Sequence, residues 1–189
     1  MTTEESAVKG RKGWLMKKLF TLVIAALALA SCTEAGSGDT APARDISPFD
    51  YITLSRTACF GACPVYDITL QGDGRVTYHG GRFTKLQGQH SETYSAGRFL
   101  EVLSMLEMRG FADFDDAYTR NTCQPWATDH PTVKIELKSA AMSKNLEWYT
   151  GCRGIKERAQ LEGLVNELER ILDVDRFIGT PDERKPKRR

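Results

Sequence analysis

The chain has 189 residues, of which 41% are hydrophobic and 27% charged, which is enough apolar mass for one folded core and too much for a chain that is disordered throughout. Its 26 Lys and Arg residues nearly balance its 25 Asp and Glu residues, so the overall charge gives no reason to expect a nucleic-acid partner. Five cysteines are too few for a miniature scaffold held together mainly by disulfides.

The first 31 residues have the order of a bacterial export signal. Lys17 and Lys18 precede an apolar run from residue 19 to residue 30, which only Thr21 interrupts. As a helix this run would be about 18 Å long at roughly 1.5 Å per residue, too short to cross a hydrocarbon core of about 30 Å. A basic segment, a short apolar segment and small residues predict a secretory signal peptide. Residues 1–15, which precede Met16, are either upstream of the true start or an extension of the basic segment.

The end of this signal, Leu29-Ala30-Ser31-Cys32, resembles the lipobox of bacterial lipoproteins. The resemblance implies cleavage before Cys32 and attachment of a diacylglycerol to its thiol. It therefore predicts a lipid-anchored protein of the cell envelope whose domain faces the periplasm. Thr33 is not the aspartate linked with inner-membrane retention in enteric bacteria, which favours the outer membrane. The alternatives are an ordinary signal peptide with a chance cysteine and a single transmembrane helix.

Composition sets the limits of the folded domain. Residues 32–48 are rich in Gly, Ser, Thr, Ala, Asp and Pro, and they contain one large aliphatic residue, Ile46. This composition predicts a flexible tether between the lipid and the domain. Residues 180–189 end in five basic residues around Pro186 and predict a disordered basic tail. Residues 49–179 are therefore expected to form a single domain.

Two kinds of hydrophobic pattern divide this domain. Alternation of apolar and polar residues predicts strands at residues 51–56, 65–70, 75–79, 132–137 and 144–149, with a less regular extended segment within 82–93. Helical spacing predicts helices at residues 95–109 and 156–172, the first with Ser95 as its N-cap. Because short connections favour antiparallel pairing, we expect an α+β fold: an antiparallel sheet of about five strands with two helices packed on one face.

Four cysteines remain in the exported domain once Cys32 is lipidated, and an even number outside the cytoplasm suggests two disulfides. Of the three possible pairings we favour Cys59 with Cys63 and Cys123 with Cys152. Gly61 permits a tight turn within the first pair. The predicted hairpin between the second pair brings its flanking segments close together.

The segment from Cys59 to Tyr66, Cys-Phe-Gly-Ala-Cys-Pro-Val-Tyr, is the most specific motif of the chain. It resembles a family of bacterial lipoproteins that carry a domain of unknown function and a Cys-Phe-Gly-x-Cys-Pro-x-Tyr hallmark. Later matches lie at residues 128–132 and 149–152, and the resemblance extends over residues 49–179. It implies an exported, lipid-anchored protein and implies no activity.

Functional side chains are sparse in this sequence. Asp129 and His130 are adjacent, so the carboxylate could orient the imidazole for acid–base work, although such a pair more often caps a loop. Arg56 and Tyr66, which flank the cysteine motif, complete the candidate polar site. No nucleophile elbow, phosphate-binding loop or paired-histidine zinc motif is present.

We therefore expect a non-enzymatic binding or interaction module without a cofactor or a metal. Its partners would be the membrane, through the lipid, and an envelope protein or cell-wall component. Trp126, Trp148 and Tyr149 could line a sugar- or peptide-binding face, although aromatic residues near strands more often pack in the core.

The alternative function is a thiol or copper-binding protein centred on Cys59 and Cys63. The Cys-x3-Cys-Pro spacing resembles the copper-binding segment of respiratory copper chaperones, and two thiolates with a distant histidine can hold Cu(I). That thioredoxin-like fold needs a helix after the cysteines, whereas a strand is predicted here after Pro64.

Overall fold

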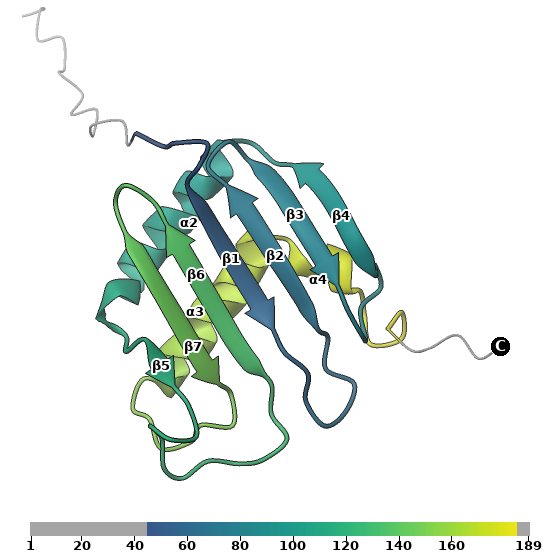
Figure 1. Ribbon diagram of the computed structural model, residues 1–189, viewed down its shortest axis with the longest axis vertical. Coiled ribbons are helices and arrows are strands. Elements are labelled where there is room, and N and C mark those ends of the chain that lie inside the picture. The colour runs from purple at the N-terminus through teal and green to yellow at the C-terminus, as the bar shows by residue number, and fades with distance from the viewer. Residues whose placement is uncertain (1–44, 185–189) are drawn as a thin grey trace, which may run out of the picture. The chain divides into compact units, whose positions relative to one another are not determined.

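The computed structural model describes residues 45–184, which form one sheet with helices against one of its faces (Figure 1). The predicted signal peptide, Cys32 and most of the predicted tether lie outside the described residues, as does the end of the basic tail. The described part of that tail, residues 180–184, forms a turn in which Arg184 Nε donates a hydrogen bond to the Gly179 carbonyl oxygen at 2.7 Å.

Seven strands form the sheet, in the order β4-β3-β2-β1-β6-β7-β5. All neighbouring pairs are antiparallel except β5 with β7, which is parallel. The strands are β1 (Tyr51–Arg56), β2 (Tyr66–Gln71), β3 (Arg75–Gly80), β4 (Gly88–Thr93), β5 (Ala117–Tyr118), β6 (Thr132–Lys138) and β7 (Ser143–Tyr149).

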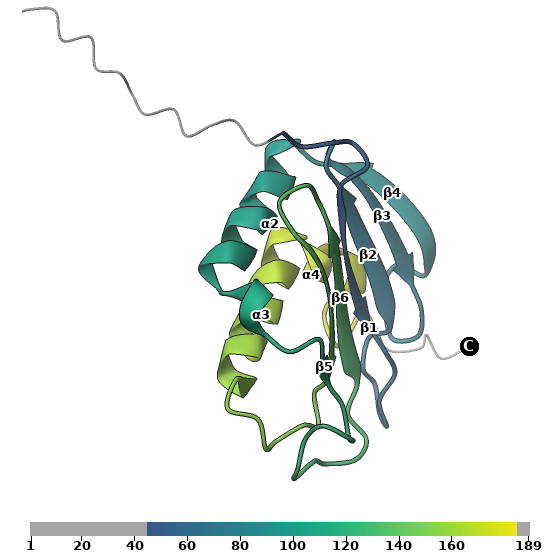
Figure 2. The same ribbon diagram turned by 60° about the vertical axis from the view of Figure 1, so that its left-hand side comes forward.

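The helices cover only one face of this sheet. Within residues 45–184 they are α2 (Gly97–Met108), the 3-10 helix η1 (Phe111–Asp113), α3 (Arg158–Ile171) and α4 (Val174–Ile178). Figure 2 shows α2 and α3 side by side to the left of the sheet, with nothing from the described chain on its other face. We call these the helix face and the open face. The fold is therefore mixed α+β, as the sequence predicts.

Side-chain alternation explains why one face is buried. In β3, Val76 and Tyr78 point to the helix face and are buried, whereas Arg75, Thr77 and His79 are exposed on the open face. The apolar stripe of α3 supplies the opposite wall of the core through Leu161, Leu164, Val165, Leu168 and Ile171. A strand period of two and a helix period of 3.6 thus meet in one apolar layer.

Three details differ from the sequence prediction. The sheet has seven strands, not about five, because the segment within 82–93 contributes β4 and the two-residue β5 is too short to show a period. A third, five-residue helix, α4, follows α3 and packs Phe177 against Tyr78, with ring centroids 4.6 Å apart. Ser95 is not the N-cap of α2: that position is Ala96, without a side-chain hydrogen bond. Within residues 45–184, no helix has the length and apolar character needed to span a membrane.

Candidate functional site

The four residues of the predicted polar site fall into two separate places. Arg56, at the end of β1, and Tyr66, at the start of β2, are cross-strand partners on the helix face. Asp129 and His130 lie in the loop that precedes β6. The structure thus joins Arg56 with Tyr66, and it does not join them with the other pair.

Arg56 and Tyr66 meet on a third residue, Glu169 of α3. Arg56 Nε and the Tyr66 hydroxyl donate hydrogen bonds to the same oxygen, Glu169 Oε1, at 2.5 and 2.6 Å. Burial and the adjacent Glu169 carboxylate hold the pKa of the Tyr66 phenol well above its ordinary value. Because one donor from β1 and one from β2 converge on a single carboxylate oxygen of α3, the cluster fastens α3 to the sheet.

Both predicted disulfides are confirmed. Cys59 is bonded to Cys63, and Cys123 to Cys152, each pair with Cα atoms 5.8 Å apart. The first bond closes a short loop between β1 and β2, whose tip exposes 87% of Phe60. The second ties the loop before β6 to the segment after β7.

Glycines let this loop pack directly against the segment after β7. The Gly154 N–H donates a hydrogen bond to the Pro125 carbonyl oxygen at 3.1 Å, and the Ala127 N–H donates to the Gly151 carbonyl oxygen at 2.8 Å. A Cβ atom at Gly154 would overlap the backbone of Gln124, so the two segments approach as closely as they do only because that side chain is absent. Together with the disulfide, these contacts fix residues 123–127.

Tyr149 contacts several loop residues at one end of the open face. Its hydroxyl donates a hydrogen bond to the Ala127 carbonyl oxygen at 2.7 Å and accepts one from Arg120 Nη2 at 3.1 Å. The ring of His130 lies edge-on to the Tyr149 ring, with centroids 6.5 Å apart. Sequence reasoning missed Arg120, because no pattern around it distinguishes it from an ordinary loop arginine.

The guanidinium of Arg120 is held between two aromatic rings. Its Cζ atom lies 4.7 Å from the ring centroid of Tyr149 and 5.0 Å from that of Trp126. Such cation–π contacts fix a long side chain that would otherwise move freely. Trp126 and Tyr149 therefore lie together at this end of the open face, whereas Trp148 is 3% exposed and faces the helices, where it packs in the core.

A hollow of about 480 Å³ opens beside this arginine on the open face, and we call it the Arg120 hollow. Its polar lining includes Thr57, Arg120, Asn121, His130, Thr132 and Tyr149. Glu147 also lines it, with its carboxylate 3.4 Å from Lys134 Nζ. The lining combines a cation, hydroxyl groups, an amide and an imidazole, which suits a polar ligand that is held by hydrogen bonds.

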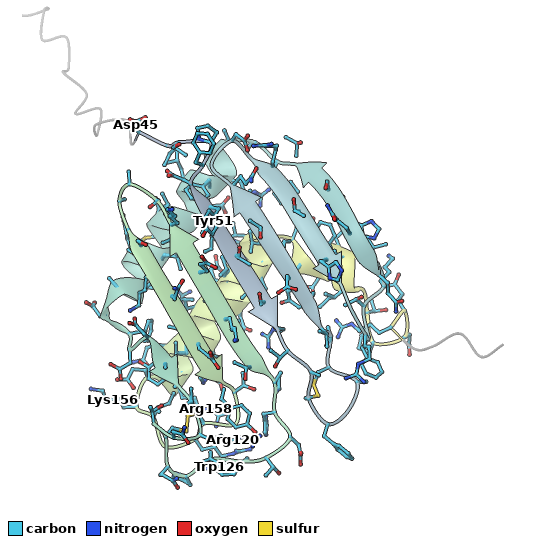
Figure 3. All side chains as sticks on the ribbon, viewed as in Figure 1. Asp45, Tyr51, Arg120, Trp126, Lys156 and Arg158 are labelled. Atoms are coloured by element: carbon cyan, nitrogen blue, oxygen red, sulfur yellow. A yellow bond between two sulfur atoms is a disulfide. The ribbon has the colours of Figure 1, made fainter. Side chains whose placement is uncertain are left out.

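The hollow lies far from the point where the chain enters the domain. Figure 3 places Asp45, the first described residue, at one end of the sheet, and Arg120 and Trp126 at the other. Among residues 45–184, no group of three or more His, Cys, Asp or Glu side chains is arranged to hold a metal ion.

Residues 50–172 match the family model described as Domain of unknown function (DUF6438). The chain belongs to this family. The match includes Arg56, Tyr66, Arg120, His130 and Glu169, so the buried cluster and the Arg120 hollow both lie within the DUF6438 domain. No curated protein matches the sequence.

Proposed function

We propose that this DUF6438 protein is a membrane-anchored envelope lipoprotein whose domain is a non-enzymatic binding module for a carboxylate-bearing component of the cell wall. The anchor is inferred from Leu29-Ala30-Ser31-Cys32, which follows a basic segment and a short apolar run. The binding role is inferred from the Arg120 hollow.

The observation that best supports binding is that the Arg120 guanidinium is held in place without a carboxylate partner among the described residues. Within residues 45–184, no carboxylate lies within 4.0 Å of its guanidinium, whose one hydrogen bond goes to Tyr149. A guanidinium has five N–H donors arranged to meet a carboxylate with two parallel bonds. Since two rings already hold Arg120 in place, little side-chain entropy remains to be lost when an anion binds.

Uncharged side chains in the lining of the Arg120 hollow suit the hydroxyl and amide groups of a cell-wall component. Thr57 Oγ1 accepts a hydrogen bond from the Thr132 N–H at 2.8 Å, which leaves its own hydroxyl proton for a ligand oxygen. The exposed Asn121 side chain offers both a donor and an acceptor. Peptidoglycan presents hydroxyl, amide and carboxylate groups close together, which is the combination that these residues complement.

The position of the hollow also fits a ligand that is distant from the membrane. The chain enters the domain at the opposite end of the sheet, near Asp45 (Figure 3). A tether attached there leaves the Arg120 end free to turn toward the cell wall.

Co-sedimentation of the full chain with purified peptidoglycan tests this function. We expect wild-type protein to pellet with the polymer, and the Arg120→Gln variant to bind roughly tenfold more weakly or worse, because one charge-assisted pairing is lost. The matched control is Arg153→Gln, an exposed arginine of the neighbouring segment that does not line the hollow. Equal binding of the two variants, or no binding by wild type, would reject the proposal.

A further inference from the structure

The two edges of the sheet differ in how their backbone hydrogen-bonding groups are covered. At the β7 edge, the Glu147 N–H donates to the Asp116 carbonyl oxygen at 2.8 Å, and β5 pairs with residues 147 and 148. Lys144 Nζ reaches back from this edge to the Phe114 carbonyl oxygen at 2.8 Å. A short strand and a lysine protect this edge against pairing with another chain.

The β4 edge has neither protection. The Tyr94 N–H bonds to the Gly74 carbonyl oxygen at 2.8 Å, and the register pairs His90 with Tyr78. Backbone groups alternate in direction along a strand, so those of Gln89, Ser91 and Thr93 point away from β3. All three residues are exposed, and no residue within 45–184 makes a backbone hydrogen bond with them on that side. In Figures 1 and 2, β4 forms the outer margin of the sheet.

We propose that β4 pairs antiparallel with β4 of a second copy of this chain, joining two sheets into one continuous sheet. The twofold axis passes midway between the two Ser91 residues, so that Ser91 faces Ser91, and Gln89 of each copy faces Thr93 of the other. This register satisfies the outward N–H and C=O groups of all three residues in each copy.

Side-chain pairing favours this register and a second copy as the occupant. With the axis between the two Ser91 residues, His90 of each copy lies directly opposite Glu92 of the other, which places two imidazole–carboxylate pairs across the strands on the helix face. Arg176 of α4 contacts Glu92 within one copy and keeps that carboxylate at the edge. A shift of the axis to Glu92 would oppose two carboxylates, and a shift to His90 would oppose two imidazoles.

The dimer is independent of the proposed binding function. β4 lies at one margin of the sheet, whereas the Arg120 hollow is lined by β6, β7 and the segments that follow β1 and β5, toward the other margin. Pairing through β4 therefore leaves both hollows open, and loss of the dimer would not remove the carboxylate site.

A cysteine at the axis tests the register. In the proposed pairing the two Ser91 Cα atoms lie about 5.5 Å apart, within disulfide range. We expect full-length Ser91→Cys protein, oxidised with diamide, to run as a covalent dimer on a non-reducing gel. Thr77→Cys is the matched control, because Thr77 is exposed on the same face directly opposite Ser91 on β3, one strand inward. Its two copies would lie three strand spacings apart, roughly 14 Å, which is too far to bond.

A proline at the same position tests the pairing itself. Ser91→Pro removes an outward N–H and no bond to β3, so the fold should survive as proline does on edge strands. We expect this variant to sediment as a monomer at concentrations where wild type is a dimer, with the unfolding midpoint of the wild-type monomer. The proposal is overturned if Ser91→Cys gives no dimer or no more than Thr77→Cys, or if folded Ser91→Pro still dimerises.

Discussion

Arg56 and Glu169 lie 113 positions apart in the chain, yet Arg56 Nε and Glu169 Oε1 are separated by 2.5 Å beneath the sheet. Tyr66 donates to the same carboxylate oxygen. Three distant segments, β1, β2 and α3, are therefore joined at one atom. Both members of the ion pair expose 23% of their side chains, so solvent screens their attraction only in part.

Removal of this carboxylate should destabilise the domain. Glu169→Gln leaves Arg56 half-buried without its counter-charge, and we expect the free energy of unfolding to fall by about 1–3 kcal/mol, less than the loss typical of fully buried pairs. Urea unfolding measures this loss. Glu167→Gln is the control, because its solvent-exposed pairing with Arg170 at 2.8 Å should contribute little to stability. Equal losses in the two variants would show that the buried cluster adds nothing.

The raised pKa of Tyr66 predicts a loss of stability in alkali. In the unfolded chain its phenol ionises near pH 10, whereas in the folded protein it keeps its proton to higher pH. The contribution is fully present below about pH 10 and is lost as pH rises toward the folded-state pKa. Tyr66→Phe should reduce the alkaline slope of the unfolding free energy by up to about 1.4 kcal/mol per pH unit. An unchanged slope would contradict this assignment.

The buried apolar stripe of α3 predicts a core substitution with a large effect on stability. Leu168 is fully buried in the stripe of α3, so Leu168→Ala should lower the free energy of unfolding by about 2–5 kcal/mol. Leu100→Ala on α2 is the control, because Leu100 exposes 37% of its surface and should cost well under half as much. A loss below about 0.5 kcal/mol at Leu168 would contradict its packing against the sheet.

Sequence patterns predict the elements of this fold that are long enough to show a hydrophobic period. The strands of the sheet core and both long helices follow from periods of two and 3.6 residues, and the disulfide pairing follows from the order of hairpin and cysteines. The two-residue β5 and five-residue α4 have too few residues to show a period. Their positions depend on partners such as Glu147 and Tyr78, which are distant in sequence.

The residues of the buried cluster and of the Arg120 hollow are harder to predict from the sequence, because they too depend on partners that are distant in the chain. Glu169 interrupts the apolar stripe between Leu168 and Leu172. A carboxylate at the margin of a buried helix face predicts a positively charged or hydroxyl-bearing partner on the sheet, so this residue could have been identified from the sequence. Arg120 had no such signal. Its placement depends on a loop fixed by a disulfide and by close backbone contacts, none of which leaves a periodic pattern.

The lipid anchor has a direct chemical test. Cys32→Ser removes the thiol that would receive the diacylglycerol, so the variant should take up no label from a fatty-acid analogue in growing cells and should remain uncleaved. The anchor is proposed from the resemblance of the Leu29-Ala30-Ser31-Cys32 segment to a lipobox, and this segment lies outside the described residues. Equal labelling of wild type and variant would reject it.

The packing at Gly154 links stability to the proposed binding site. A Cβ atom there would overlap the Gln124 carbonyl oxygen and lie 2.9 Å from the Pro125 nitrogen, so Gly154→Ala must push residues 124–126 away. Since Trp126 stacks on Arg120, the shift should loosen the guanidinium as well as cost about 1–3 kcal/mol of stability. We expect a lower urea midpoint, altered tryptophan fluorescence and weaker co-sedimentation with peptidoglycan. Gly97→Ala is the control, because its nearest neighbour would be Ser95 Oγ at 3.9 Å and alanine favours the first turn of α2. If both alanine variants keep wild-type stability and binding, residues 124–127 do not pack on Gly154 as described.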